Sequence, residues 1–444
     1  MNRYLPYLLF VLPIALQAAK PNIVFILADD MGYGDLSCYG HPKAKTPIID
    51  NLAKEGVRFT QHYSNGTECS PTRTAFLTGK YPQRAGGLEC AIGTGNVGRY
   101  DDAIALAEAQ DLGLPADQTV IPGKLKEEGY KCGIFGKWHL GYEPHFNPMV
   151  HGWDAFFGYM GGNVHYFNHK ELSDLHVLYR GNLPVYAEGY MSNLITEESV
   201  KFIEANKTDP FFLFVSHESP HFPFQGPNDE DKEINADNWT TPDEDTYVAM
   251  LEDLDNQVGK ILEALEAADV AENTVVVFVS DNGGFGKIAN MGPLRGAKST
   301  TFEGGIRVPL VIKWPGKIEA GIENSQVCTT FDLTYSFMKM AGVGDSDLEQ
   351  LDGLDILSHI SQKNDDYSRT LFWRGKRGTR VYSAIRKDNM KYVRKVEDGE
   401  MEEWLFDLSK DIGEENDLGE AQGELQARLR GQLLKWEREV KPVR

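Results

Sequence analysis

Residues 22–30 have the sequence NIVFILADD, in which an unbroken apolar run is followed at once by two aspartates. The apolar residues fill consecutive positions rather than alternate ones, which indicates a β-strand covered on both faces, as in a largely parallel sheet. Three further runs have the same character: 132–135, 211–215 and 274–280. The sequence therefore predicts an α/β fold built around a large, mostly parallel sheet.

Helix patterns lie between these runs, as an α/β fold requires. One helix is expected to begin with Thr46 as its N-cap and Pro47 in its first position, and to end at Gly56. A longer helix is expected over about residues 243–268. Its apolar side chains form a single stripe: Tyr247, Leu251, Leu254, Val258, Ile261 and Leu265.

Polar residues capable of chemistry follow each of the four apolar runs. They are Asp29-Asp30, Gly136-Lys137-Trp138-His139, Ser216-His217-Glu218-Ser219-Pro220-His221 and Asp281-Asn282. In open α/β sheets, binding sites form at the carboxyl ends of the strands. Four strands that each bring charged or imidazole groups to that end predict a functional site along this edge of the sheet.

After about residue 327 the pattern changes to short segments that are typical of antiparallel strands. The expected strands are 371–373, 381–385, 391–393 and 404–408, followed by a polar helix from about residue 420. We therefore expect two domains. A large α/β domain covers residues 20–330, and a smaller α+β domain with an antiparallel sheet covers residues 331–444.

The first residues, MNRYLPYLLFVLPIALQAAK, are similar to a secretory signal peptide. Arg3 gives the positive charge near the start, residues 5–16 form the apolar core, and Gln17-Ala18-Ala19 is a small-residue exit. The apolar core is short for a bilayer span, and a short membrane anchor is the alternative. We predict a signal peptide over residues 1–19 and a periplasmic or secreted protein that is not embedded in the membrane.

The overall composition is that of a globular protein with a strong excess of acidic residues. Of 444 residues, 41% are hydrophobic and 25% are charged, and the formal net charge is −21. This charge argues against nucleic acid as a partner. It also argues mildly against a polyanionic substrate, unless basic residues gather locally at a site.

Two acidic pairs at strand ends form a candidate metal site. Asp29, Asp30, Asp281 and Asn282 offer only oxygen ligands, and hard oxygen donors suit Ca²⁺ or Mg²⁺ rather than zinc. The alternative is that each pair simply forms the turn after a strand. Two such pairs after the two clearest strands favour the metal site.

Residues 68–84, ECSPTRTAFLTGKYPQR, contain a candidate nucleophile or anion site. Ser70 and Pro71 are expected to be the N-cap and first residue of a helix that ends at Gly79. Cys69 would then lie beside the free N–H groups of the helix start, and Arg73 about one turn further on. The alternative is an inert buried thiol. The five cysteines, Cys38, Cys69, Cys90, Cys132 and Cys328, are an odd number, so one of them cannot be in an intrachain disulfide.

These segments resemble the type I sulfatases of the alkaline phosphatase superfamily. CSPTR matches the C-x-P-x-R motif of that family, and further matching segments follow in the family's order: ADDMGYGD, GKWHLG, PHFPF, SDNGG and GPLRGAKSTTFEGGIRVP. The resemblance covers residues 21–315 strongly and WLFDLSKDIGEENDL more weakly. One departure is Cys132, where the second signature usually has Ser or Thr. The resemblance implies an alkaline-phosphatase-like α/β/α sandwich.

The resemblance also implies roles for individual residues. Cys69 would be converted to formylglycine (3-oxoalanine) by a maturation enzyme, and its hydrate would be the nucleophile. One Ca²⁺ per chain would be held by Asp29, Asp30, Asp281, Asn282 and residue 69. Arg73 would hold the modified residue. His139 would assist the release of sulfate, and His221 would donate a proton to the departing alcohol. The substrate would be bound by Lys137, His221, Arg295 and Lys298.

The chemistry gives independent reasons for this arrangement. Cleavage of a sulfate ester moves negative charge onto the leaving oxygen, so a cation and a general acid must meet there. A plain serine would become a sulfate ester that is hard to hydrolyse. A hydrated aldehyde can instead expel sulfate by collapsing to the carbonyl form.

The leading hypothesis is an exported hydrolase of sulfate esters, with a sulfated carbohydrate or an aryl sulfate as substrate. A formylglycine-dependent phosphonate monoester or phosphodiester hydrolase is one alternative, and a non-catalytic binder of sulfated glycans is another. Roles for His145, His165 and His217 stay open. Four residues either line the rim of the pocket or belong to an ordinary hairpin: Trp373, Arg374, Lys376 and Arg377.

Overall fold

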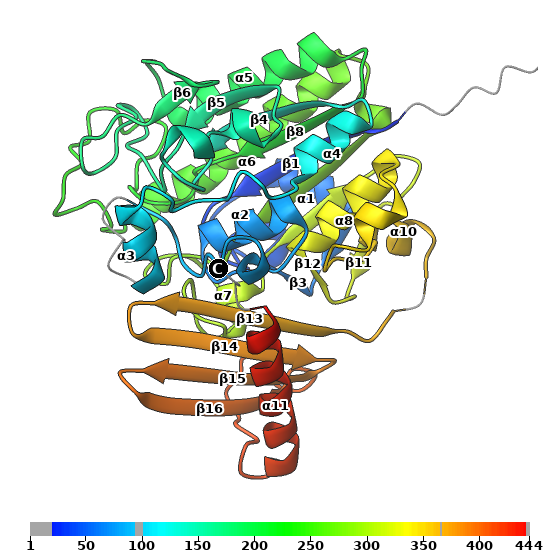
Figure 1. Cartoon of the computed structure of the whole chain (residues 1–444). Helices are drawn as coiled ribbons and strands as arrows, with labels where there is room; N and C mark the ends of the chain where they lie inside the picture. The colour runs from blue at the N-terminus through cyan, green and yellow to red at the C-terminus, as the bar shows by residue number, and fades with distance from the viewer. Residues whose placement is uncertain (1–19, 94–100, 365, 441–444) are drawn as a thin grey trace, which may run out of the picture.

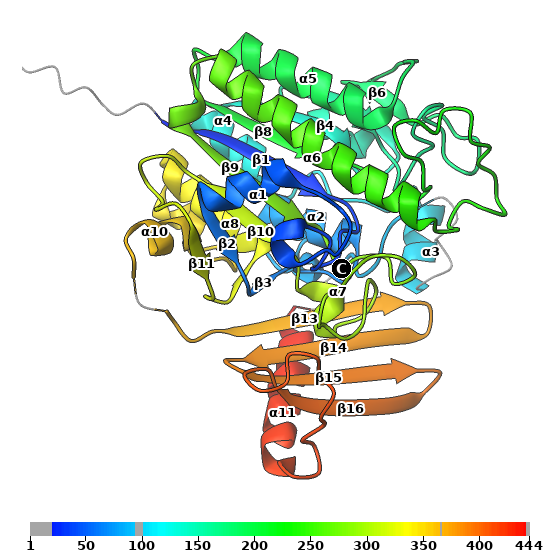
Figure 2. The ribbon, with the colours of Figure 1, turned by 180° about the vertical axis from the view of Figure 1, so that it is seen from behind.

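The computed structural model describes residues 20–93, 101–364 and 366–440, with the backbone alone for residues 101–104. The predicted signal peptide, residues 1–19, lies outside the described residues. Figures 1 and 2 show a large body of sheet and helices and, at one end of it, a smaller sheet crossed by a single helix.

A mixed sheet of ten strands forms the centre of the large body. From edge to edge the order is β11 (Ile322–Asn324), β2 (Val57–Phe59), β10 (Leu310–Lys313), β9 (Thr274–Ser280), β1 (Asn22–Ala28), β8 (Phe211–Ser216), β4 (Lys131–Lys137), β5 (Ala155–Tyr159), β6 (Leu178–Arg180) and β7 (Leu183–Pro184). The four apolar runs of the sequence are the neighbouring strands β9, β1, β8 and β4, and all of them are parallel. The predicted parallel sheet is therefore confirmed.

The register of the four parallel strands places the polar residues that follow them at the same edge of the sheet. Ala28 of β1 pairs with Ser280 of β9, while Leu27 pairs with Ser216 of β8. Ser216 in turn pairs with Gly136 of β4. Because the four strands run in the same direction and end together, the residues that follow them meet at one edge.

Helices cover both faces of this sheet, and the side chains of β1 show why. Its odd-numbered residues (23, 25 and 27) pack with α2 (Cys69–Thr78), α4 (Ile121–Glu127) and α8 (Thr330–Ala341). Its even-numbered residues (24, 26 and 28) pack with α1 (Pro47–Lys54), α5 (Met191–Asn206) and α6 (Glu244–Ala267). Figure 1 shows the first group in front of the sheet, and Figure 2 shows the second. The α/β/α sandwich is confirmed.

Both expected helices are present. Thr46 precedes α1 and Pro47 is its first residue. Asp243 is the N-cap of α6, where its side chain accepts a hydrogen bond from the backbone N–H of Thr246 at 2.8 Å. The apolar stripe predicted for α6 is buried against the sheet.

The smaller sheet has four antiparallel strands, as predicted, but each is eight residues long. The strands are β13 (Thr370–Arg377), β14 (Arg380–Lys387), β15 (Met390–Glu397) and β16 (Glu400–Asp407). Helix α11 (Gly423–Glu439) packs across one face through Leu429, Leu433 and Trp436. The strand ends carry charged residues such as Lys395 and Glu402, which pair across strands at 3.0 Å. An apolar pattern reveals only the buried part of such a strand, so the expected strands were too short.

The helices that follow residue 330 pack on the large body. Phe337 of α8 belongs to the same core as Phe25 of β1 and Phe76 of α2. The smaller sheet begins only at Thr370. The division at residue 330 stays a prediction. The remaining α-helices and strands of the described residues are β3 (His62–Tyr63), α3 (Asp101–Glu108), α7 (Glu303–Ile306), β12 (Cys328–Thr329), α9 (Asp345–Leu348) and α10 (Ile356–Ser361).

Candidate active site

Cys69 is the first residue of helix α2, which lies in front of the large sheet in Figure 1. The predicted N-cap, Ser70, is wrong: Glu68 is the N-cap, with extended backbone, and the Ser70 side chain has tertiary partners instead. The Ser70 hydroxyl donates to the carbonyl of His139 at 2.9 Å and accepts from the N–H of Ile92 at 3.1 Å. The helix ends at Gly79, as predicted, where a φ of 68° favours glycine.

Aromatic packing fixes α2 against the sheet. The ring of Phe76 stacks on that of Phe25 in β1, with centroids 3.9 Å apart and planes 7° from parallel. Every residue of α2 is buried. Cys69 and the strand ends are therefore held in one rigid unit.

The Cys69 thiol lies among charged groups at the strand ends. Its Sγ is 3.2 Å from Oδ1 of Asp29 and 3.6 Å from Nζ of Lys298. Burial, together with the negative charges of Asp281 and Asp29, raises the pKa of the thiol well above its usual range. The unmodified thiol is therefore a poor source of thiolate.

Arg73 joins three strand ends through its buried guanidinium. Nη2 donates to Oδ2 of Asp281 at 3.0 Å, after β9. Nη1 donates to Oγ of Ser216 at 2.6 Å and to the carbonyl of Lys137 at 3.1 Å, on β8 and β4. Its Nε is buried without a hydrogen-bond partner among the described residues. In this structure the bonds of Arg73 go to the strand ends and not to Cys69.

Two lysines pair with the carboxylates that follow β1. Nζ of Lys137 contacts Oδ2 of Asp29, and both side chains are fully buried. Nζ of Lys298 lies 2.7 Å from Oδ2 of Asp30. Burial alone would raise the pKa of Asp30, but the charges of Lys298, His221 and Lys137 outweigh it and hold that pKa below its usual value.

The two predicted catalytic histidines have different surroundings. Nε2 of His221 is 3.3 Å from both Oδ2 of Asp30 and Nζ of Lys298. Its Nδ1 lies 2.6 Å from the carbonyl of Phe222, so Nδ1 carries the proton that is donated there. The ring of His139 contacts the carbonyl of Ile92 through Nε2. Burial and the charge of Lys137 lower the pKa of His139 well below its usual value.

The residues present fit a divalent cation. Ligand atoms of Asp29, Asp30, Cys69 and His221 all lie within 4.8 Å of one another. Oδ1 of Asn282 is buried without a partner among the described residues, while its Nδ2 donates to Asp30 at 2.7 Å. Such a carbonyl oxygen, beside three carboxylates, is a donor set that suits a hard cation. Asp281 lies at the same edge, with one oxygen bound by Arg73 and the other by the N–H of Asp30 at 3.2 Å.

The structure does not bring Arg295 into this group. Its guanidinium lies 4.2 Å from the ring centroid of Phe302 and donates to the carbonyl of Glu414 at 2.8 Å. Arg295 therefore joins the loop that carries Lys298 to the segment that follows the smaller sheet. The sequence could not reveal this, because Glu414 lies 119 residues further along the chain.

The histidines that the sequence left open lie in different surroundings. His217 is buried, with neither ring nitrogen bonded to a described residue, and burial lowers its pKa to about 3. His165 bonds Gln225 at 3.2 Å, and His145 is an exposed side chain near Asp111. None of the three has a described contact with Cys69 or with the lysines of the cluster.

Sequence reasoning missed two carboxylates that support the site. Glu68, directly before Cys69, is buried and accepts hydrogen bonds from Arg377, Ser299 and the N–H of Ala91. Asp35 accepts from the N–H groups of Gly32 (2.7 Å) and Asn290 (2.8 Å). The hydroxyl of Tyr247 also donates to Asp35, at 2.6 Å. Their positions beside recognised motifs are the signal that could have indicated them.

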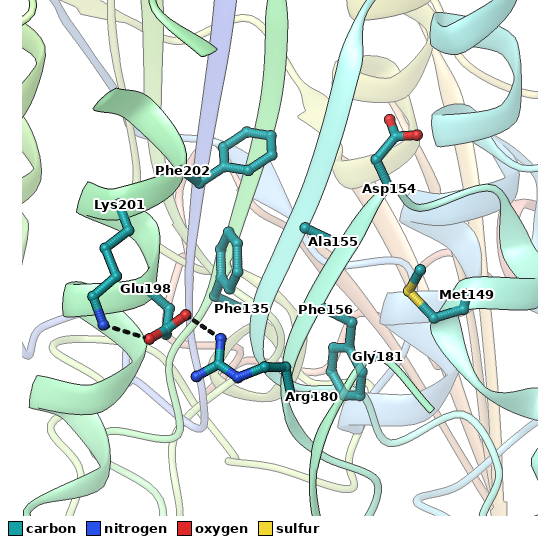
Figure 3. Close-up of a pocket in the computed structure, with 10 residues that line it drawn as sticks. All are labelled: Phe135, Met149, Asp154, Ala155, Phe156, Arg180, Gly181, Glu198, Lys201 and Phe202. Carbon is teal, nitrogen blue, oxygen red and sulfur yellow. Dashed lines mark hydrogen bonds and ion pairs between the residues drawn. The ribbon is translucent and has the colours of Figure 1, made fainter. Parts of the chain in front are cut away.

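A separate hollow of about 430 Å³ lies away from this cluster (Figure 3). Phe135, Phe156 and Phe202 line it together with an ion-paired set, Arg180, Glu198 and Lys201. It contains none of the site residues that the sequence predicts. With Asp154, which also lines it, the hollow has two basic and two acidic side chains and therefore no net positive charge with which to attract an anion.

Two further observations concern the chain as a whole. No disulfide bond joins any of the five cysteines, all of which lie in the described part. Within residues 20–93, 101–364 and 366–440, no helix has both the length and the apolar character that a bilayer crossing requires.

A mixed sheet covered on both faces, with its polar cluster at the carboxyl edge, is the architecture of the alkaline-phosphatase-like α/β proteins. Residues 21–343 match the sulfatase family, and residues 297–439 match the C-terminal region of N-sulphoglucosamine sulphohydrolase. The chain belongs to the sulfatase family.

Individual relatives agree with this assignment. The chain is 35% identical to N-acetylgalactosamine-6-sulfatase from Canis lupus familiaris, over 76% of this chain and 65% of that protein. It therefore spans less than two thirds of that relative's length. The crystal structure of Ps i-CgsB in complex with k-i-k-neocarrahexaose is similar, with a TM-score of 0.80, 31% identity, and coverage of 94% of this chain and 92% of that one.

A more distant structure shares the fold alone. The phosphonate monoester hydrolase of Agrobacterium radiobacter has a TM-score of 0.65 at 19% identity, covering 95% of this chain and 96% of that chain.

Replacing Arg73 should destabilise the fold as well as the site. Arg73→Ala leaves the carboxylate of Asp281 buried without its cation, and we expect the free energy of unfolding to fall by about 3–5 kcal/mol. Urea denaturation followed by tryptophan fluorescence measures this. Lys43→Ala is the control, since Lys43 and Glu244 form an exposed pair at 2.6 Å whose loss should cost less than about 1 kcal/mol. Equal losses in the two variants would show that the Arg73 network does not stabilise the fold.

Proposed function

We propose that this protein is a sulfuric ester hydrolase that acts through the cluster around Cys69. The observation that carries the proposal is the position of Cys69, at the start of a rigid helix and within 3.6 Å of both a carboxylate and a lysine. A non-catalytic binder of sulfated glycans has no need of a buried imidazole such as His221 at the same place. Family membership supports the hydrolase over such a binder.

The charges of the cluster suit an anionic substrate once a metal is present. Three carboxylates and three cations balance one another: Asp29, Asp30 and Asp281, with Arg73, Lys137 and Lys298. A divalent cation would give this set a net positive charge, so that sulfate is attracted locally although the protein as a whole carries −21.

We propose that Cys69 is converted to formylglycine by a maturation enzyme. Formylglycine supplies a hydrated aldehyde whose hydroxyl attacks sulfur and whose collapse expels sulfate. The raised pKa of the buried Cys69 thiol supports this, since an unmodified thiol is a poor nucleophile here.

The other side chains bind the substrate and move its protons. Nζ of Lys298 lies 3.6 Å from Sγ of Cys69, which supports a role for it, together with Lys137, in holding sulfate oxygens. His221 donates from Nδ1 to a carbonyl, so its Nε2 faces the cluster and exchanges a proton with the departing alcohol. Burial lowers the pKa of His221 to about 3, and the negative charge of a bound sulfate would raise it again. His139 would assist the later release of sulfate.

We propose Ca²⁺ as the metal, held by Asp29, Asp30, Asp281, Asn282 and the modified residue 69. When bound, the ion polarises the sulfate group and stabilises negative charge on its oxygens. A sulfated carbohydrate is the proposed substrate. Its support comes from the relative named N-acetylgalactosamine-6-sulfatase and from Ps i-CgsB, which was crystallised with a neocarrahexaose. Export to the periplasm or the medium is proposed from the signal-like residues 1–19.

Mass spectrometry and turnover together test the nucleophile. In protein from its native host, we expect the peptide covering residues 67–80 to be lighter than its cysteine form. The same protein should hydrolyse a sulfate ester much faster than a matched phosphodiester, and Cys69→Ala should lose turnover while keeping the thermal midpoint. Faster cleavage of the phosphodiester would instead favour the phosphonate monoester or phosphodiester hydrolase. An unmodified Cys69 in active protein would rule out the mechanism.

Metal removal tests the proposed ion. Dialysis against EGTA should lower the thermal midpoint, and Ca²⁺ at about 100 times its Kd should restore about 2.7 kcal/mol of stability. Asp30→Asn should abolish this response, whereas Asp245→Asn, an exposed position in the first turn of α6, should keep it. If neither EGTA nor Ca²⁺ changed the thermal midpoint of unfolding, the result would count against the metal site.

The choice of leaving group tests His221. His221→Ala should slow hydrolysis of a sugar sulfate by about 10²–10⁴-fold, because an alkoxide needs a proton to depart. Hydrolysis of 4-nitrophenyl sulfate should slow far less, since nitrophenolate departs without one. The exposed His145→Ala is the control and should change neither rate. Equal losses on both substrates would assign His221 to binding instead of proton transfer.

A further inference from the structure

Strand β13 of the smaller sheet lies along the segment that leads into Cys69. Nε1 of Trp373 donates to the carbonyl of Ser64 at 2.7 Å. Two residues on, a methyl group at Gly375 would lie 2.5 Å from Oγ1 of Thr67. Alternate residues of a strand point to one face, so Arg377 follows on this same face.

Arg377 forms a two-fold ion pair with Glu68. Its Nε donates to Oε1 at 2.7 Å and its Nη2 to Oε2 at 2.6 Å. Glu68 is buried, and it also accepts from Oγ of Ser299 at 2.7 Å and from the N–H of Ala91 at 2.8 Å. Glu68 precedes Cys69 and Ser299 follows Lys298, so Arg377 is held one residue away from two members of the site.

One edge of the guanidinium is left for another partner. Nη1 of Arg377 has no hydrogen-bond partner among the described residues, and 26% of its side chain is exposed. The bidentate contact fixes the plane of the group, so the free N–H groups have a set direction. A fixed, accessible cation beside the site is a means of recognising an anion.

The neighbouring arginine of the strand is a useful contrast. Arg374 contacts Glu89 and is 27% exposed, nearly the same as Arg377. It points to the opposite face of β13, and its guanidinium also lies 3.7 Å from Glu437 of α11. Arg374 is a matched control because its side chain is about as exposed as that of Arg377 but lies on the other face of the strand.

We propose that Arg377 determines substrate specificity by binding, through its free guanidinium edge, a second anionic group on the sugar whose sulfate is cleaved. The group is an oxyanion, either another sulfate or a uronate carboxylate. The inference rests on the proposed function, because it assumes that a sulfated sugar binds at Cys69. It also assigns the smaller domain a part in substrate choice.

The test compares three sugars with wild type, Arg377→Gln and Arg374→Gln. The sugars are N-acetylgalactosamine 6-sulfate, N-acetylgalactosamine 4,6-disulfate and the chondroitin 6-sulfate disaccharide, which carries a uronate. With Arg377→Gln, we expect KM for one of the two doubly charged sugars to rise about 10- to 100-fold, while kcat and the KM for the monosulfate change less than about three-fold. Arg374→Gln should leave this selectivity unchanged. Whichever sugar responds identifies the source of the second anion.

A purely structural role for Arg377 predicts a different result. In that case Arg377→Gln, which leaves the buried carboxylate of Glu68 without its partner, would lower the thermal midpoint and raise KM equally for all three sugars. The double variant Glu68→Gln, Arg377→Gln removes the unpaired charge and should recover the midpoint without recovering the selectivity. The inference would be overturned if KM rose equally for all three sugars in Arg377→Gln, or if the double variant recovered the selectivity.

Measuring sugar binding without turnover tests this inference independently of the proposed hydrolytic function. Calorimetric titration of the Cys69→Ala variant with the three sugars measures discrimination without any turnover. A preference for a doubly charged sugar that disappears with Arg377→Gln would support the role of Arg377 even if no hydrolysis occurs. No preference in the Cys69→Ala protein would overturn it, whatever the hydrolytic activity of the wild type.

Discussion

The buried guanidinium of Arg73 is the interaction on which the rest of the site depends. It projects from the helix that begins with Cys69 and bonds to groups at the ends of β9, β8 and β4. A planar guanidinium with several fixed donors can satisfy such divergent acceptors, which a lysine ammonium cannot do with the same geometry. The position of Cys69 is therefore set by the sheet itself, and the stacking of Phe76 on Phe25 holds the same helix against β1.

Charge balance explains how three basic side chains can be buried together in an acidic protein. Three carboxylates at the strand ends keep three basic side chains charged although all six are buried or nearly so. Isolated burial of any of these groups would favour its neutral form. Together the six groups have no net charge, so a bound divalent cation would make the net charge of the cluster positive. The acidity of the remaining surface then matters little for substrate binding, because distant exposed charges are screened by salt.

The smaller domain is joined to the site by buried ions as well as by packing. Lys391 of β15 is fully buried between Glu303 at 2.7 Å and Glu414 at 2.9 Å. Glu303 begins α7, in the same chain segment that carries Lys298, and Arg307 pairs with it at 3.2 Å. The smaller sheet and the chain segment that carries Lys298 and Glu303 therefore share one ionic network. These buried ion pairs, together with the hydrogen bond from Arg295 to Glu414, tie the smaller sheet to the loop of Lys298.

The sequence by itself determined the central strands, the residues at their ends and the helix that carries Cys69, because continuous apolar runs and polar strand ends are local patterns. It did not determine where side chains with distant partners point. Ser70 is a good helix cap in isolation, yet its hydroxyl bonds His139 and Ile92. Arg295 belongs to a recognised motif, yet it stacks on Phe302 at 4.2 Å. Only the tertiary structure decided these cases and the pairing of Glu68 with Arg377, which lie 309 residues apart. The contacts join separate segments of the chain, which become neighbours only when the chain has folded.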